Sequence, residues 1–228
     1  MIDIRNHALD RLRAGELSLG VGLRQARTVD IAKAMKTAGF DWLFIDMEHN
    51  AMDVDMAVQI CVAAQDAGIT PIVRVPGFQH FHATRVLDGG AQGIVVPHVD
   101  DAETAAQMVS NVRYPPLGHR SVTAIANADA IAAVPGVDAL LIGTSDLTME
   151  MGIPGQFDHQ DVIAAYETVI AACRKHGKHP GMGGVYDPAN MQRYISIGAR
   201  LILSGSDFSF LMAGARAQAS AVRAMSPS

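Results

Sequence analysis

The chain has 228 residues, 49% of them hydrophobic, and a formal net charge of −5 at pH 7. It is long enough to bury a large core in one domain, and its acidic balance argues against a nucleic acid or an anionic membrane surface as a partner. Cys61 and Cys173 lie in helix-like apolar patterns and are expected to be buried thiols. Without a signal-peptide pattern or a membrane-spanning run, we expect a cytoplasmic protein.

Short apolar segments alternate with helical patterns along the chain. We expect strands at 18–23, 42–46, 71–75, 92–97, 139–143, 179–184 and 200–204. Most of them follow a segment that is apolar at i, i+3, i+4 and i+7 and that ends at a glycine, such as Gly68. Because strands and helices alternate, and the strands are almost wholly apolar, the sequence predicts an α/β fold with a parallel sheet covered by helices.

The number of expected strands is one short of a closed (β/α)8 barrel, which needs eight. Between 97 and 139 the sequence runs from RYPPLGHRSVTA directly into a helical pattern. We therefore predict a single-domain TIM barrel over residues 1–228 whose fifth strand is missing near Ala124–Ile125. Two alternatives remain open, a true deletion and a polypeptide with additional residues at this junction. An intact mass of 24.2 kDa would support the deletion.

Polar residues follow several of the expected strands, at the carboxyl ends where parallel α/β folds bind their ligands. They are Asp46, Glu48 and His49, then Arg74, His98, Asp100, the segment Gly143–Asp146, and Asp207. A carboxylate beside an imidazole makes a positioned base, so Asp46 and His49 indicate an active site. Arg74 stands in an apolar strand and must meet an anion there. That anion is either a neighbouring carboxylate in an ion pair, or a substrate carboxylate or developing oxyanion.

The segment GTSDLTMEMG is expected to run from a strand into a helix. Backbone N–H groups at Ser145 and Asp146 could take a substrate carboxylate, and the Asp146 side chain could ligate a divalent cation. The alternative is an ordinary helix cap. No lysine is expected at the carboxyl end of a strand, where a Schiff-base lysine would stand, so carbonyl chemistry here would need a metal ion. The four lysines are Lys33, Lys36, Lys175 and Lys178.

Two weaker patterns concern histidines and glycines. His98 and His119 could line the mouth of the site, although a lone histidine is more often only hydrogen-bonded. His80 and His82 are expected at the surface. Gly-Met-Gly-Gly at 181–184 is not a dinucleotide fingerprint and is expected to let the backbone approach a ligand or to fill a barrel taper.

With these residues in place, the sequence resembles the metal-dependent (class II) pyruvate aldolases, the family of 4-hydroxy-2-oxo-heptanedioate aldolase and 2-dehydro-3-deoxyglucarate aldolase. The resemblance runs along nearly the whole chain. It rests on FDWLFIDMEHN, PIVRVPG, LDGGAQGIVVPHVD, RYPPLGHRS and LLIGTSDLTMEMG, in this order. It implies a (β/α)8 barrel, usually a homohexamer, that reversibly cleaves 4-hydroxy-2-oxo acids to pyruvate or hydroxypyruvate and an aldehyde. The setting it implies is the catabolism of aromatic or sugar acids.

The resemblance also implies roles for particular residues. His49 would be the base, paired with Asp46, and Arg74 would contact the keto or enolate oxygen of the substrate. Asp88 would reach the site of a neighbouring subunit. Asp146 would bind Mg²⁺, Mn²⁺ or Co²⁺, which stabilises the enolate. Gly143, Ser145 and Asp146 would bind the substrate, with backbone amides taking the pyruvate carboxylate.

One family feature is absent from the sequence. The second metal ligand in the family is a glutamate on the fifth strand, in a run like Met-Ile-Glu-Thr, and no such run occurs here. It should fall at the junction near Ala124–Ile125, where the strand count also falls short. Two other functions therefore remain open, an acyl-CoA lyase of the citrate-lyase type and a non-catalytic barrel that binds a 2-oxo acid. The first should show a basic patch for the nucleotide, and none is evident in the sequence.

Overall fold

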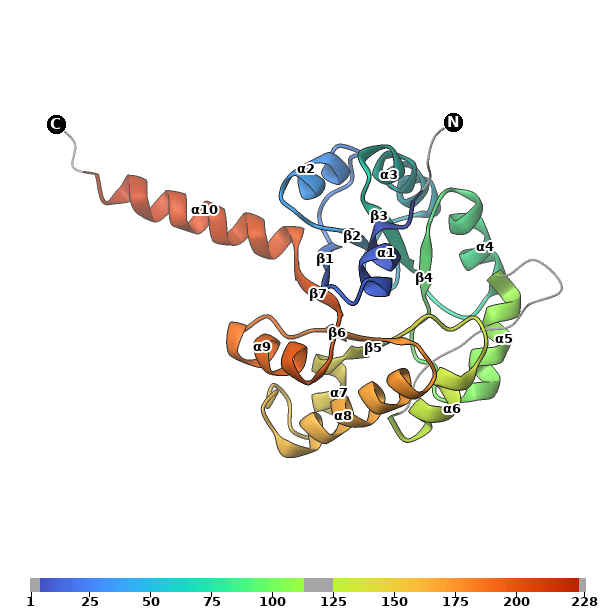
Figure 1. Cartoon of the computed structure of the whole chain (residues 1–228). Coiled ribbons are helices and arrows are strands. Elements are labelled where there is room, and N and C mark those ends of the chain that lie inside the picture. The colour runs from blue at the N-terminus through green and yellow to red at the C-terminus, as the bar shows by residue number, and fades with distance from the viewer. Residues whose placement is uncertain (1–4, 113–124, 226–228) are drawn as a thin grey trace.

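The computed structural model describes residues 5–112 and 125–225. Helices and strands alternate along it (Figure 1). The α-helices are α1 (His7–Arg13), α2 (Ile31–Thr37), α3 (Val54–Ala67), α4 (His80–Asp88), α5 (Ala102–Val112), α6 (Ala128–Ala133), α7 (Thr144–Glu150), α8 (Gln160–Lys175), α9 (Pro188–Ile197) and α10 (Asp207–Arg223), with a 3-10 turn at Ile125–Asn127.

The strands form one parallel, curled sheet in the order β4-β3-β2-β1-β7-β6-β5. Their bounds are β1 (Ser18–Leu23), β2 (Trp42–Asp46), β3 (Thr70–Arg74), β4 (Gly93–Val95), β5 (Ala139–Gly143), β6 (His179–Gly183) and β7 (Leu201–Ser206). Each coincides with an expected strand to within two residues at either end. The parallel α/β architecture predicted from the sequence is therefore confirmed.

The edges of this sheet are β4 and β5, the two strands between which the sequence predicts a missing one. Within the described residues the sheet has seven strands and is open between these edges. Residues 113–124, which are the whole of RYPPLGHRSVTA with His119 and Ala124, lie outside the described residues. The missing fifth strand thus stays a prediction, and what the structure shows is a half-barrel.

Three apolar clusters hold the sheet between its helices. One joins β1–β4 to α2, α3 and α4 on the outside, through residues such as Leu43, Ile45 and Val73. A second joins β5–β7 to α6, α8 and α9. The third lies on the inner face and contains Trp42, Phe44 and Leu201. Side chains alternate between faces along a strand, so β2 serves the outer and the inner cluster with successive residues.

Helix α1 closes the amino-terminal end of the half-barrel. Its Ala8 and Leu12 are buried in the inner cluster, and the Ala8 N–H donates to the hydroxyl of Thr70 at 3.0 Å. Beneath it, Trp42 fills the space beside Gly20, where a Cβ atom would lie 2.1 Å from the indole ring. Side chains therefore fill the amino-terminal end of the half-barrel, and a ligand would have to bind at the opposite, carboxyl end.

Helix α10 differs from the others because it buries no residue, and in Figure 1 it projects away from the body of the molecule. Its first residue is nevertheless firmly held. The Asp207 carboxylate accepts hydrogen bonds from three successive backbone N–H groups of the loop after β1, those of Arg24, Gln25 and Ala26. Within the described chain, no helix combines the length and apolar character needed to cross a bilayer.

The two cysteines are buried and unpaired, as the sequence predicts. Burial raises the pKa of Cys61 to about 12 and, despite a backbone hydrogen bond and the Lys178 charge, that of Cys173 to about 11. Both thiols therefore stay protonated at neutral pH and act as small apolar side chains in the outer clusters.

Candidate active site

Asp46 and Arg74 are brought together by strand register. They are partners in the parallel pairing of β2 with β3, at the last residue of each strand. Trp42, Phe44 and Asp46 alternate onto the inner face, where Phe44 and Trp42 are part of the inner cluster. An apolar strand thus ends in a carboxylate that faces the inside of the half-barrel, next to a guanidinium in the same position of the adjacent strand.

The ion pair between Asp46 and Arg74 is bidentate and largely shielded from solvent. Arg74 Nε donates to Asp46 Oδ1 at 2.9 Å and Nη2 donates to Oδ2 at 2.8 Å, while the side chains are 17% and 3% exposed. Burial by itself would raise the pKa of Asp46, but hydrogen bonding and charge from Arg74, with two backbone N–H groups, hold it below its usual value. The Phe44 ring supports the guanidinium, with its centroid 5.3 Å from Cζ.

Glu48 extends this pair into a chain of contacts. Its Oε2 lies 2.8 Å from Arg74 Nη1, and its Oε1 lies 2.7 Å from His98 Nε2. The Glu48 side chain is 10% exposed, whereas His98 is 75% exposed. Side chains therefore link the carboxyl ends of β2 and β3 to the segment after β4. The ion-pair alternative for Arg74 is realised with both neighbouring carboxylates.

The expected pairing of Asp46 with the His49 imidazole takes a different form. Asp46 Oδ1 accepts the backbone N–H groups of Glu48 and His49, at 3.1 and 3.3 Å. The carboxylate beside the His49 ring is that of Glu48, 3.7 Å from Nε2. Asp46 thus shapes the turn that carries His49, and the imidazole itself is 55% exposed toward solvent. The catalytic roles of these residues remain predictions.

A second wall of the carboxyl edge is formed by the start of α7, directly after β5. The hydroxyl of Thr144 donates to the Gly183 carbonyl oxygen at 2.7 Å and lies 2.7 Å from the Tyr166 hydroxyl. The Ser145 hydroxyl donates to the Gly184 carbonyl oxygen at 3.1 Å. These bonds fix the first turn of α7 against the end of β6. Ser145 and Asp146 are exposed there, beside Gly143.

Gly184 has to be a glycine for this contact to form. Its φ is +83°, and a Cβ atom at this position would lie 2.8 Å from the Ser145 hydroxyl and 3.0 Å from its backbone nitrogen. The glycine run at 181–184 therefore brings backbone close to α7. The two expected roles of this run, approach to a ligand or filling of a barrel taper, stay predictions.

The described residues do not by themselves form a metal site. Asp146 offers one exposed carboxylate, 3.0 Å from where a Cβ of Gly143 would lie. In the parts of the chain that the structure describes, no three His, Cys, Asp or Glu side chains are grouped to hold an ion. A single carboxylate falls short of the ligand set that a protein normally supplies.

Asp88 is not brought to this edge. It is the last residue of α4, which runs back along the sheet after β3, so within one chain it lies toward the opposite end from Arg74. Asp207 is also a structural group, since its carboxylate is taken up by loop amides. A contribution of Asp88 to a site would therefore need a second copy of the chain.

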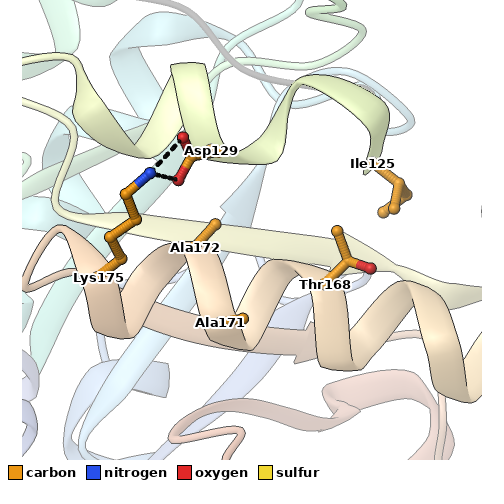
Figure 2. Close-up of a pocket in the computed structure, with 6 residues that line it drawn as sticks. All are labelled: Ile125, Asp129, Thr168, Ala171, Ala172 and Lys175. Carbon is orange, nitrogen blue, oxygen red and sulfur yellow. Dashed lines mark hydrogen bonds and ion pairs between the residues drawn. The ribbon is translucent and has the colours of Figure 1, made fainter.

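A hollow on the outer layer lies between α6 and α8 (Figure 2). It is lined by Ile125, Asp129, Thr168, Ala171, Ala172 and Lys175. Lys175 Nζ is 2.8 Å from each Asp129 oxygen, and hydrogen bonds from Lys175 and His176 lower the pKa of Asp129. Lys175 ends α8, which runs back from the carboxyl edge. This hollow is thus separate from the candidate site.

Sequence reasoning did not find the roles of Thr144 and Tyr166, whereas the ion pair of Glu48 with Arg74 was among its alternatives. The stacking of Tyr166 on Tyr194, with ring centroids 3.8 Å apart, places its hydroxyl against Thr144 from a distant helix. No local pattern reports such a contact. The link from His98 to Glu48 joins residues 50 positions apart and was likewise out of reach.

Comparison with known proteins points to one family. A family model described as HpcH/HpaI aldolase/citrate lyase matches residues 24–213. The chain is 36% identical to the 4-hydroxy-4-methyl-2-oxoglutarate aldolase tasA of Hapsidospora irregularis, covering 97% of this chain and 96% of the relative. It is 31% identical to the 4-hydroxy-2-oxo-heptane-1,7-dioate aldolase of Salmonella paratyphi C, with coverages of 95% and 94%. The crystal structure of an HpcH/HpaI aldolase from Desulfitobacterium hafniense matches with a TM-score of 0.88 at 28% identity, over 97% and 98% of the two chains.

The alignment with the Hapsidospora protein extends over 264 positions, more than the 228 residues of this chain. The relative therefore carries residues that have no counterpart here.

Proposed function

Because the chain belongs to the HpcH/HpaI aldolase/citrate lyase family, we propose that it is an aldolase acting on 4-hydroxy-2-oxo acids. It reversibly cleaves them to pyruvate, or hydroxypyruvate, and an aldehyde. The observation that carries this proposal is Arg74, a guanidinium locked by Asp46 at the carboxyl edge of the sheet. The relatives named above are aldolases of such acids by name.

In this reaction Arg74 binds the 2-oxo oxygen of the substrate. Asp46 takes the Nε N–H and one Nη2 N–H in hydrogen bonds, and Glu48 Oε2 lies against Nη1 as an ion pair without a hydrogen bond. Among the described residues, N–H groups on both Nη nitrogens are therefore left for a ligand. As the C3–C4 bond breaks, negative charge moves onto that oxygen. A donor already fixed in place stabilises this charge without reorganising, which lowers the barrier.

His49 is the base in the proposal. Its imidazole takes the proton from the C4 hydroxyl, so that the C4–O bond becomes the carbonyl of the leaving aldehyde and the C3–C4 electron pair forms the enolate. Returning a proton to C3 yields pyruvate. The exposed ring and the adjacent Glu48 carboxylate support this assignment, because a nearby carboxylate stabilises the imidazolium that forms.

The substrate carboxylate is proposed to bind at the start of α7. Ser145 and Asp146 lie in its first turn, where backbone N–H groups have no partner within the helix. The bonds of Thr144 to Gly183 and Tyr166 hold this turn from behind. Gly143, before it, leaves the approach free of a side chain.

A divalent ion, Mg²⁺, Mn²⁺ or Co²⁺, is part of the proposal with Asp146 as one ligand. The described residues supply only this carboxylate, and the glutamate expected on the fifth strand would fall outside them. When bound, the ion would act as a Lewis acid on the 2-oxo acid.

We also propose a cytoplasmic homo-oligomer, a hexamer in the family pattern, with the barrel over residues 1–228 as its single domain. Phe208, Leu211 and Val222 of α10 are 45%, 63% and 51% exposed and share one face at 3.6 residues per turn. An unpacked apolar helix face of this kind fits a second copy, and the role of Asp88 at a neighbouring subunit's site is proposed from the resemblance alone.

The alternatives have less support. An acyl-CoA lyase of the citrate-lyase type shares the family name but predicts a basic nucleotide patch that the sequence does not contain. A non-catalytic barrel that binds a 2-oxo acid could use the same guanidinium, but binding alone needs no base such as the exposed His49 imidazole, and the relatives named above are enzymes by name. Nucleic acid and membrane remain unexpected as partners because of the acidic balance.

The test is pyruvate release from a panel of 4-hydroxy-2-oxo acids, coupled to lactate dehydrogenase, with and without Mn²⁺. We expect at least one acid to be cleaved with turnover well above a His49→Ala variant. No release from any acid, under either condition, would reject the aldolase assignment. Release of acetyl-CoA or another acyl-CoA from a thioester substrate would support the lyase instead.

A further inference from the structure

His98 is the one non-glycine residue in the described chain with a positive φ, at 50°. Left-handed backbone is unfavourable for a residue with a Cβ atom and persists where the surroundings impose it, often at functional sites. Val99, directly after it, is fully buried. The chain is thus anchored on one side of a strained residue whose own side chain is mostly exposed.

The strained backbone aims the imidazole at the candidate site. His98 Nε2 lies 2.7 Å from Glu48 Oε1, and Glu48 Oε2 lies 2.8 Å from Arg74 Nη1. Glu48 is 10% exposed and His98 is 75% exposed, so the histidine closes the solvent side of a buried carboxylate. This arrangement ties the segment after β4 to the guanidinium through one intermediate.

Glu48 needs such a restraint because it faces competing partners. Its Oε2 lies 2.8 Å from Arg74 Nη1, where it makes no hydrogen bond, and 3.7 Å from His49 Nε2. Arg74 carries N–H groups on both Nη nitrogens that no described residue takes in a hydrogen bond. A carboxylate released from His98 could rotate onto those N–H groups, and this movement would occupy donors that the reaction uses.

We propose that His98 is a positioning residue for Arg74 and acts through Glu48. By holding Glu48 Oε1, it keeps Glu48 Oε2 in its ion-pair contact beside Arg74 Nη1 and leaves the Nη N–H groups open to the 2-oxo and enolate oxygen. The inference rests on the proposed aldolase function and deepens it, because it adds a residue outside the base and the guanidinium.

The primary test compares His98→Gly with the wild type. Glycine removes the imidazole and accepts the positive φ, so the fold should be retained or slightly stabilised. We expect kcat/KM to fall about tenfold, and the inhibition constant of oxalate, a mimic of the pyruvate enolate, to rise by a similar factor. A loss of folded enzyme alone would leave the oxalate constant unchanged.

A double-mutant cycle tests whether the effect passes through Glu48. In a Glu48→Ala background, adding His98→Gly should change kcat/KM less than about twofold, because there is no carboxylate left to hold. His98→Gln places an amide donor near the Nε2 position and should restore most of the activity. His176→Gln is the control, since His176 also contacts a carboxylate, Asp129 at 3.0 Å, but on the outer layer.

The inference is overturned if His98→Gly matches the wild type, or if its effect is the same in both backgrounds. These results leave the aldolase function intact. If the wild type cleaves no 4-hydroxy-2-oxo acid, the function fails separately, and a crystal structure of His98→Gly then decides the inference. A structure in which Glu48 has left its contact with Arg74 Nη1 supports the inference. A structure in which this contact is unchanged refutes the inference.

Discussion

Asp46 and Arg74 stand opposite each other as the last register pair of β2 and β3 and share two hydrogen bonds, of 2.9 and 2.8 Å. The pair lies above the inner apolar cluster, with Phe44 beneath the guanidinium. Because Asp46 neutralises Arg74 where it is least exposed, the arginine can remain in an apolar strand and still present donors at the mouth.

Replacing Arg74 should end the reaction. Arg74→Ala removes the donors to the 2-oxo oxygen and leaves Asp46 buried without its cation, so we expect kcat to fall by about 10²–10³ or more. Arg74→Lys is the matched variant. It keeps a positive charge beside Asp46 but cannot make the bidentate contact of a guanidinium. This variant should therefore fold well and remain nearly inactive. Steady-state pyruvate release measures both, and wild-type turnover in either would refute the assignment.

Asp46 should make stability depend on acid pH. Its pKa is lowered in the folded state, so its contribution is fully present above the unfolded-state value, 3.8, and is lost as pH falls through the lower folded-state pKa. Urea unfolding between about pH 5 and pH 3 should therefore show a smaller pH-dependent loss in Asp46→Asn than in the wild type. At neutral pH this variant should itself lose up to about 3–5 kcal/mol, less if Glu48 compensates. An Asp46→Asn variant with the same pH-dependent loss as the wild type would contradict this account.

Gly184→Ala should disturb the start of α7. The positive φ costs an alanine about 1–2 kcal/mol, and the new Cβ would press on Ser145 at 2.8 Å. Displacing the proposed carboxylate site should lower kcat/KM by about tenfold or more. Gly183→Ala is the control, because its Cβ would meet Leu203 at an ordinary 3.5 Å. Thermal unfolding and kinetics that rank the two variants equally would contradict this account.

Chelation should slow the enzyme reversibly. We expect excess EDTA to reduce pyruvate release and added Mn²⁺ to restore it. Asp146→Asn should weaken Mn²⁺ binding, measured by calorimetry, on the order of tenfold or more, because a charged ligand is lost. Ser145→Ala, one residue away, should leave Mn²⁺ affinity unchanged. An unaffected rate in EDTA would remove the ion from the proposal.

The apolar face of α10 should set the oligomeric state. Leu211→Asp places a charge on this face, and light scattering should show dissociation of the wild-type assembly toward smaller species. Ser220→Asp lies on the opposite side of the helix and should leave the assembly intact. A wild-type protein that is monomeric at micromolar concentration would contradict the proposed oligomer.

Local sequence patterns were sufficient to predict the helices and strands. They also predicted that the candidate residues lie together at the carboxyl edge of the sheet. Apolar runs such as Trp42–Ile45, most of them preceded by a helical pattern and a glycine, predicted every strand that the structure describes. The ligand rule for parallel sheets then placed Asp46, Arg74 and Asp146 at one edge. The resemblance of several motifs in order identified the family, which the comparisons confirm.

The contacts within that edge could not be predicted, because they depend on packing between distant segments. The His49 ring lies beside Glu48 and not beside Asp46, since Arg74 takes both Asp46 oxygens. The Thr144–Tyr166 contact depends on how α8 lies against β5 and β6. The left-handed backbone of His98 follows from the path of the chain after β4, and a histidine in the sequence gives no indication of this conformation.

The division of the outer apolar side chains into two clusters has a consequence for how the molecule opens. One cluster belongs to β1–β4 and the other to β5–β7, and the sheet is continuous between them where β1 pairs with β7. The inner cluster, which contains Trp42 of β2 and Leu201 of β7, couples the two halves across this pairing. We therefore expect the amide hydrogen exchange of the two halves to differ in protection only where the inner cluster is disrupted.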